Sequence, residues 1–187
     1  MLGWADAHPH GTCVIHASDM YLKVQSDASF NSRPGSKSVA GGYHYLGNYD
    51  DPTFFNAITV PMCSTIPVVC GAVSEAELGA AYANGHVAIE ERNILQSLGY
   101  PQPPTPLLVD NKLAVALANE SITPKKSKSM DHRFNWLRDR VRQNQFAVDY
   151  IPGPDNKSDF FTKSLPVADF EALAPFFGTD ASPPLST

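Results

Sequence analysis

Three segments with strand character, one long helix and a short apolar strand follow one another in this chain. Residues 21–27 alternate polar and apolar side chains, and residues 39–47 and 54–62 are rich in β-prone residues. Residues 75–98 place their apolar side chains on one arc of a helix. Residues 107–109 are apolar enough to form a strand buried within a sheet. This succession requires a fold in which a hairpin run comes before parallel strands.

The rest of the chain continues in the same manner. We expect helices at 111–119 and 130–144, a last strand at 146–151, and a helix at 158–163 whose pattern continues to 177. The predicted order is therefore β-β-β-α-β-α-α-β-α. It predicts an α/β protein with a mixed five-stranded sheet, antiparallel at one side and parallel at the other, flanked by helices.

The length of 187 residues fits one domain with irregular ends. We expect an irregular lead-in or connector at 1–19, a domain at 20–177 and a disordered polar tail at 178–187. No stretch approaches the roughly 20 apolar residues of a membrane helix, so we expect no membrane partner. The N-terminus lacks the pattern of a secretory signal, and three loosely spaced cysteines favour a reducing compartment.

The charge is unevenly distributed along the sequence. The chain has a net charge of −5, but residues 125–142 alone carry seven basic and two acidic side chains. A basic stripe on an otherwise acidic protein suits a partner that touches one face, such as a nucleic acid. A solvated helix face explains the same charges equally well.

Four acidic residues occupy positions that we do not expect to be simply solvent-exposed. Asp27 ends the alternating strand, and Asp110 directly follows the apolar strand. Glu77 lies on the apolar arc of the long helix, and Asp159 opens the last helix. Sites in α/β sheets form beyond the carboxyl ends of strands, and clustered carboxylates need a cation to offset their repulsion. Such a set suits Mg²⁺, which prefers oxygen ligands.

Each of these acids also has an ordinary structural explanation. Asp27 could be an exposed strand-end residue, and Glu77 could close a capping box with Ser74. Asp110 could cap the helix that follows it. Asp159 could be a first-turn acid favoured by the helix dipole.

Six motifs in a fixed order carry a resemblance to a known family. They are SDASF at 26–30, AGGYHYLG at 40–47, VSEAELGAAY at 73–82, LLVDNKLAVALA at 107–118, MDHRFNWLRDRV at 130–141 and DYIPGPDNKSDFFTK at 149–163. Together they resemble the ribonuclease H domain at the C-terminal end of copia-type LTR retrotransposon Pol polyproteins. The resemblance covers about residues 20–165 and implies the ribonuclease H fold.

The resemblance also implies a catalytic and metal-binding set: Asp27, Glu77, Asp110 and Asp159. It implies two Mg²⁺ ions, for which Mn²⁺ can substitute, and hydrolysis of the RNA strand of an RNA–DNA hybrid that leaves 5′-phosphate ends. The expected partners are the hybrid and a covalently linked reverse transcriptase. The expected location is a cytoplasmic virus-like particle or the nucleus, without secretion. The expected nucleic-acid contacts are Ser29, Asn111, Lys125, Lys126, Lys128, Arg133 and Arg138.

The loop before the final Asp departs from the pattern of many cellular and retroviral ribonucleases H, which place a histidine there. Residues 146–159 contain no histidine.

The main alternative function is a catalytically silent, hybrid-binding or scaffolding module. An integrase or transposase core reads Asp, Asp, Glu along the chain, whereas here the Glu precedes the second Asp. A small-molecule α/β enzyme is disfavoured because no glycine-rich phosphate loop follows a strand.

Replacing Lys125, Lys126 and Lys128 together by Gln should weaken hybrid binding, because each lysine that neutralises a phosphate releases counterions. We expect the slope of log K against log salt to flatten by about one for each phosphate-binding lysine that is replaced. Fluorescence anisotropy with a labelled hybrid over a salt series measures this slope. An unchanged slope would remove these lysines from the binding surface.

Overall fold

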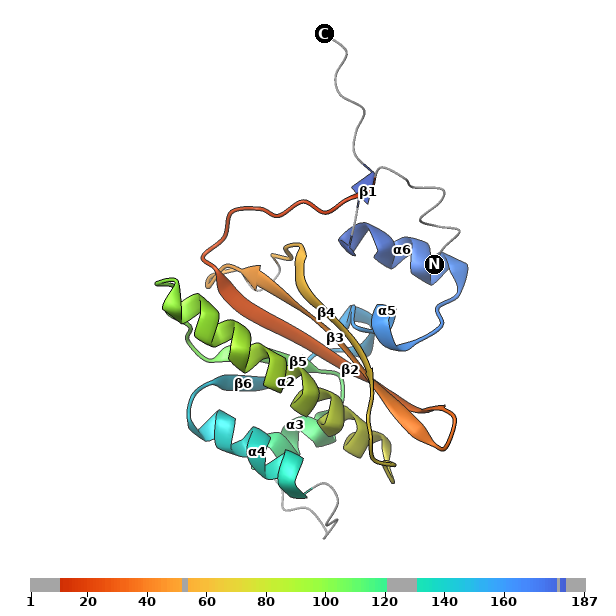
Figure 1. The fold of residues 1–187 in the computed structure, drawn as a ribbon. Helices are drawn as coiled ribbons and strands as arrows, with labels where there is room; N and C mark the ends of the chain where they lie inside the picture. The colour runs from red at the N-terminus through yellow and green to blue at the C-terminus, as the bar shows by residue number, and fades with distance from the viewer. Residues whose placement is uncertain (1–10, 52–53, 121–130, 178, 181–187) are drawn as a thin grey trace.

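A computed structural model describes residues 11–51, 54–120, 131–177 and 179–180. Its central feature is a five-stranded sheet in the order β4-β3-β2-β5-β6 (Figure 1). The strands are β2 (Tyr21–Arg33), β3 (Lys37–Gly47), β4 (Ile58–Thr65), β5 (Thr105–Val109) and β6 (Phe146–Tyr150). β2, β3 and β4 pair antiparallel, whereas β5 is parallel to both β2 and β6. The predicted mixed sheet is confirmed.

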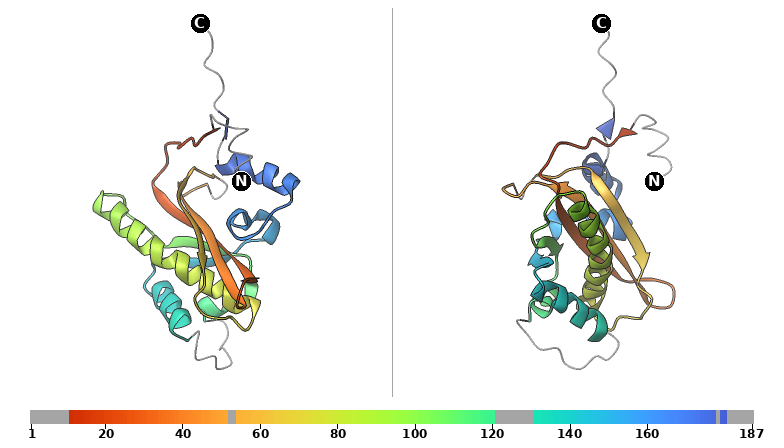
Figure 2. Two further views of the ribbon diagram at one scale, coloured as in Figure 1. Left: turned by 45° about the vertical axis from the view of Figure 1, so that its right-hand side comes forward. Right: turned by 60° about the vertical axis from the view of Figure 1, so that its left-hand side comes forward.

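Helices cover both faces of this sheet. They are α2 (Val73–Ser97), α3 (Lys112–Ala118), α4 (Asp131–Arg142), α5 (Asp159–Thr162) and α6 (Val167–Phe177), with a 3₁₀ turn η1 at Gly153–Asp155. Figure 2 shows α2 and α4 on one side of the sheet and α5 and α6 on the other. A second, two-stranded sheet joins β1 (Gly11–Thr12) to β7 (Thr179–Asp180) in antiparallel pairing. Within the described residues, every helix is too short or too polar to cross a membrane.

The main core lies between the sheet and the α2 side. β2 contributes Leu22 and Val24, β5 contributes Leu107 and Val109, and all four are at most 1% exposed. They form one cluster with apolar residues of α2, α3 and α4 and of the neighbouring strand β6: Leu78, Ala81, Ala88, Leu95, Ala114, Leu117, Phe134, Leu137, Phe146 and Val148. The apolar arc predicted for the long helix is therefore the buried face of α2.

Aromatic side chains fill the opposite face. Tyr43 of β3 contacts Phe161 of α5 and Phe177 of α6, with ring centroids 6.2 and 5.5 Å apart. Phe55 also packs against Phe177 at 6.0 Å. Because both faces of β2 are covered, even its polar residues Lys23 and Gln25 are buried.

Three local predictions were wrong. β2 continues to Arg33, so Asp27 lies within the strand rather than at its end. α2 has Ala72 as N-cap without a side-chain cap, and Glu75 reaches back to accept a bond from the amide of Gly71 at 2.7 Å. The predicted capping box between Ser74 and Glu77 is therefore absent. The helix predicted across 158–177 is broken at 163–166, since Pro166 lacks an amide hydrogen for a continuing helix.

Two adjacent glycines in β3 allow close packing on both faces of the sheet. A Cβ added at Gly41 would lie 2.2 Å from Thr162 Cγ2 of α5. A Cβ added at Gly42 would lie 2.2 Å from Asn84 Oδ1 of α2 and 2.7 Å from the backbone oxygen of Gln25. The sheet is thus sandwiched most tightly next to Ser26 and Asp27, the β2 partners of these glycines.

Gly42→Ala should lower the free energy of unfolding by about 2 kcal/mol, because the added methyl group meets backbone as well as the Asn84 side chain. Gly71→Ala is the matched control, since a Cβ there would contact only Glu75 Oε2 at an ordinary 3.5 Å. Urea denaturation of both variants measures the difference. Equal stability of Gly42→Ala and the parent chain would contradict this packing.

Candidate active site

Asp27 lies near the middle of the central strand β2 and is 1% exposed. Its register partner on β3 is Gly41, the residue on which α5 packs. The hydroxyl of Thr162 in α5 donates a hydrogen bond to Asp27 Oδ2. The short distance between strand and helix, which Gly41 permits, therefore places this buried carboxylate against α5.

Asp110 lies close to Asp27, at the end of the neighbouring strand β5. The last parallel pair between β2 and β5 is Ser26 with Val109, so β2 runs on beyond the end of β5. Asp110 follows directly, at the carboxyl end of β5. The next residue, Asn111, is the N-cap of α3 and accepts a bond from the amide of Ala114 at 3.0 Å. Because Asn111 caps this helix, Asp110 does not have the capping role that its position also suggested.

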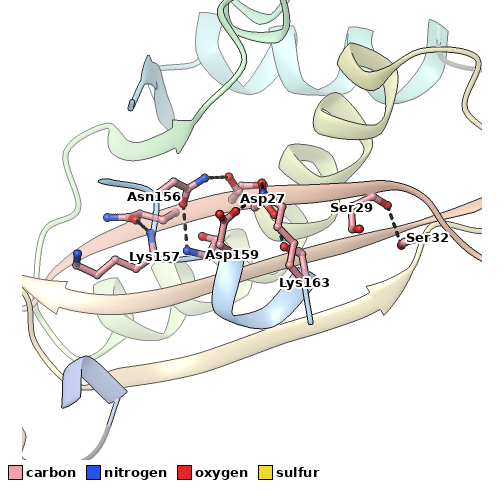
Figure 3. A network of polar contacts seen from close by, with 11 residues as sticks. Asp27, Ser29, Ser32, Asn156, Lys157, Asp159 and Lys163 are labelled. Carbon is pink, nitrogen blue, oxygen red and sulfur yellow. Dashed lines mark hydrogen bonds and ion pairs between the residues drawn. The ribbon is translucent and has the colours of Figure 1, made fainter. Parts of the chain in front are cut away.

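Asp159 is positioned by a loop that is hydrogen-bonded to the middle of β2. The side-chain amide of Asn156, which is 3% exposed, donates to the carbonyl oxygen of Ser26 at 3.0 Å. The amide of Lys157 donates to Gln25 Oε1 at 3.2 Å. Figure 3 shows Asn156, Asp159 and Asp27 gathered along this stretch of β2. The loop thus fixes the start of α5, where Asp159 is the first residue.

Asp27, Asp110 and Asp159 form one cluster. Each offers a carboxylate oxygen, and these three oxygens lie within 4.8 Å of one another. They come from β2, from the end of β5 and from α5. The tertiary structure therefore brings together three of the four predicted acids, which are 83 and 49 residues apart along the chain.

Glu77, the fourth acid, is not one of these three but is electrostatically coupled to them. It lies in the second turn of α2, is 3% exposed, and accepts a hydrogen bond from the backbone amide of Ala28. Its Oε2 atom is buried without a hydrogen-bond partner. Burying a carboxylate oxygen without a hydrogen-bond partner lowers the stability of the protein, unless a bound ligand or ion satisfies that oxygen.

The cluster strongly perturbs the ionisation of its members. Burial, followed by the charges of Asp27 and Asp110, raises the pKa of Glu77 to about 9. Burial raises the pKa of Asp27 to about 6, although the Thr162 hydroxyl and the Lys163 ammonium oppose the shift. The pKa of Asp110 is also raised, mainly by burial. The site holds more negative charge than the protein by itself accommodates well.

Lys163 and Thr162 belong to this site but were not among the predicted residues. Lys163 Nζ lies 2.5 Å from Asp159 Oδ1 and 3.8 Å from Asp27 Oδ1. Burial alone would lower the pKa of Lys163, but its hydrogen bond with Asp159 and the nearby acids raise it above the usual value. The motif DYIPGPDNKSDFFTK contains both residues, and their spacing of three and four from Asp159 is the signal that one helical turn faces the cluster.

The predicted nucleic-acid contacts fall into four groups. Ser29 lines a groove of about 570 Å³ beside Thr162 and Lys163. Asn111 uses its side-chain oxygen to cap α3. On α4, Arg138 donates to the carbonyl oxygen of Leu117 at 2.8 Å, and the Arg133 guanidinium lies 5.6 Å from the Tyr82 ring centroid. Lys125, Lys126 and Lys128 lie outside the described residues. A binding role for these residues stays a prediction.

Comparison with solved structures identifies the class of fold. The chain is similar to the N-terminal ribonuclease H domain of a Mycobacterium tuberculosis protein, with a TM-score of 0.52, 16% identity and coverage of 83% of this chain and 97% of that one. It is also similar to LC11-RNase H1, isolated from compost, with a TM-score of 0.55, 12% identity and coverage of 76% and 93%. The protein has the ribonuclease H fold, as predicted.

Sequence comparison shows which proteins the chain is related to. The chain is 27% identical over 169 residues to the retrovirus-related Pol polyprotein from transposon TNT 1-94 of Nicotiana tabacum, covering 90% of this chain. It is 26% identical over 157 residues to the Ty1-LR2 Gag-Pol polyprotein of Saccharomyces cerevisiae, covering 83%. No protein-family model matches. The chain spans 12% and 8% of the length of these two relatives. Its sequence relatives are thus retrotransposon Pol polyproteins, which confirms the predicted resemblance.

Glu77→Gln should stabilise the protein at alkaline pH in the presence of EDTA. Because the pKa of Glu77 is about 9 in the folded state, the folded protein keeps a proton that the unfolded chain releases above its ordinary carboxyl pKa. The free energy of unfolding of the parent therefore falls as the pH rises toward 9. We expect the variant to be more stable by about 2 kcal/mol at pH 8, with the difference vanishing near pH 5.

Urea denaturation at a series of pH values measures this difference. Glu90→Gln is the control, because Glu90 is an exposed residue of the same helix. A Glu77→Gln protein whose stability follows that of the parent at every pH would show that Glu77 titrates normally.

Proposed function

We propose that this chain is a metal-dependent ribonuclease H that hydrolyses the RNA strand of RNA–DNA hybrids during reverse transcription of an LTR retrotransposon. The convergence of Asp27, Asp110 and Asp159 within 4.8 Å is the observation that carries the proposal. The ribonuclease H fold and the Pol relatives agree with it. LC11-RNase H1 has also been solved in complex with an RNA/DNA hybrid, and that structure matches this chain with a TM-score of 0.50 and 14% identity.

The donor set fits divalent Mg²⁺. All four acids offer carboxylate oxygens, the ligand type that Mg²⁺ prefers, and the unpartnered Glu77 Oε2 is an available ligand. We propose that Asp27, Asp110, Asp159 and Glu77 hold two such ions, with Mn²⁺ as a substitute. Bound there, the metal would supply an activated water and stabilise the leaving oxygen of a phosphodiester.

The protein itself supplies position and shape. The Thr162 hydroxyl orients Asp27, and Asn156 anchors the loop that carries Asp159. The groove beside Lys163 is lined by Ser29, Ser32 and Arg33, which offer two hydroxyl groups and one guanidinium. These groups suit the 2′-hydroxyls and phosphates of an A-like hybrid, which is recognised by shape rather than by base sequence.

Two further features support an enzyme within a larger assembly. All four implied acids are present, which favours catalysis over a silent binding module. Because the chain spans 12% or less of its Pol relatives, we propose that the parent polyprotein also carries a linked reverse transcriptase. Its proposed place of action is a cytoplasmic virus-like particle or the nucleus.

Asp110→Asn should lower the rate of hybrid cleavage by on the order of 100-fold or more, because it removes one charge from the cluster at nearly constant shape. The assay incubates labelled RNA–DNA hybrid, double-stranded RNA and double-stranded DNA with and without Mg²⁺. We expect Mg²⁺-dependent cleavage of the hybrid alone.

Asp169→Asn is the matched control, since Asp169 is an exposed acid of α6 and the chemical change is the same. Hybrid binding without cleavage by the parent chain would instead favour the silent module. Undiminished cleavage by a pure Asp110→Asn preparation would refute the proposed site.

A further inference from the structure

Lys163 brings a positive charge into the carboxylate cluster. Its Nζ atom lies 2.5 Å from Asp159 Oδ1 and 3.8 Å from Asp27 Oδ1, so it pairs with two of the three clustered acids (Figure 3). Asp159 and Lys163 are four residues apart and face each other across one helical turn. Among the ion pairs found in the described part of the chain, only those of Lys163 involve the cluster.

We propose that Lys163 is the internal counter-cation of the metal-free cluster and that a divalent cation must displace its ammonium group in order to bind. The inference rests on the proposed function only in that the cluster binds a divalent metal. Lys163 is accordingly a positioning residue that sets the metal affinity of the site and the stability of the metal-free protein.

The ammonium group and a metal ion would compete for the same oxygens. Mg²⁺ binds carboxylate oxygens at about 2.0–2.1 Å. An ammonium nitrogen 2.5 Å from Asp159 Oδ1 and a metal ion bound to the same oxygen would be at most about 4.6 Å apart, and like charges at such a separation repel each other. Occupation by one cation therefore disfavours the other, and the coupling is reciprocal.

Lys163 has both the freedom and the space to leave. Its side chain is 42% exposed, and its backbone is extended where the chain leaves α5. The four-carbon stem is flexible, and Lys163 itself lines the groove of about 570 Å³ that also contains Ser29 and Arg33. The ammonium can thus swing into this groove without movement of the backbone.

Thr162 keeps Asp27 in place when Lys163 departs. The Thr162 hydroxyl bonds to Asp27 Oδ2, whereas the Lys163 ammonium faces Oδ1. The two adjacent residues therefore have different roles. The uncharged hydroxyl of Thr162 orients the buried carboxylate of Asp27, and Lys163 supplies a positive charge that can move away.

The test compares metal binding by the full chain and by Lys163→Met, which keeps most of the stem but lacks the charge. Isothermal titration with Mn²⁺ and with Mg²⁺ should show about twofold to fivefold tighter binding to Lys163→Met, the size expected from removing a partly exposed ion pair. In EDTA, the same variant should unfold at a lower urea concentration than the parent. Lys163→Arg, which retains the charge, should bind metal about as the parent does.

Lys157→Met is the matched control, because Lys157 lies on the loop just before α5 and places its ammonium 4.0 Å from the Phe176 ring centroid. It should leave metal affinity unchanged. Unchanged or weaker metal binding by folded Lys163→Met would overturn the inference. Absence of metal binding by the parent as well as the variants would overturn the proposed function instead, so the two failures are distinguishable.

A second measurement needs no substitution. Acetylation of lysines followed by mass spectrometry should show greater labelling of Lys163 in saturating Mg²⁺ than in EDTA, because metal binding releases the ammonium group from Asp159. Labelling of Lys157 should not change. Equal labelling of Lys163 in both conditions would contradict displacement even if Lys163→Met did not fold.

Discussion

Burial of negative charge on the central strand β2 is the constraint around which this structure is arranged. Asp27 is almost fully buried there, and the carboxyl groups of Asp110, Asp159 and Glu77 lie around it. Desolvation and mutual repulsion both disfavour such a group of carboxylates. The protein offsets part of this cost with the Lys163 ammonium, the Thr162 hydroxyl and the amide of Ala28, but Glu77 Oε2 is left without a partner.

The clustered carboxylates do not prevent folding, because the apolar contacts that stabilise the fold lie outside the cluster. The apolar core between α2 and the sheet, and the aromatic layer under α6, hold the scaffold on both sides. Gly41 then allows α5 to approach β3 closely, and Asn156 ties the preceding loop to β2. Rigid elements thus impose a geometry that the carboxylates would not adopt by themselves, as is common where a site is built for a ligand.

Most of the fold could be predicted from the sequence because its signals are local. Alternation identified β2, the apolar arc identified α2, and the order of elements specified a mixed sheet. The errors arose where local rules compete. Ser74 and Glu77 have the spacing of a capping box, yet Glu75 bonds to the Gly71 amide instead. Asp110 had two open explanations, a cap and a site residue, and Asn111 takes the capping role.

The order of strands and helices, the identity of the four acids and the relationship to retrotransposon Pol polyproteins all follow from the amino-acid sequence. The sequence does not show that three of those acids meet within 4.8 Å, that Glu77 is buried with an unsatisfied oxygen, or that Lys163 enters the cluster. These features emerge only from the packed chain, because periodicity reports no more than which face of an element is apolar. Distances between charges far apart in the chain depend instead on strand register, on helix approach at Gly41 and on a loop fastened by Asn156.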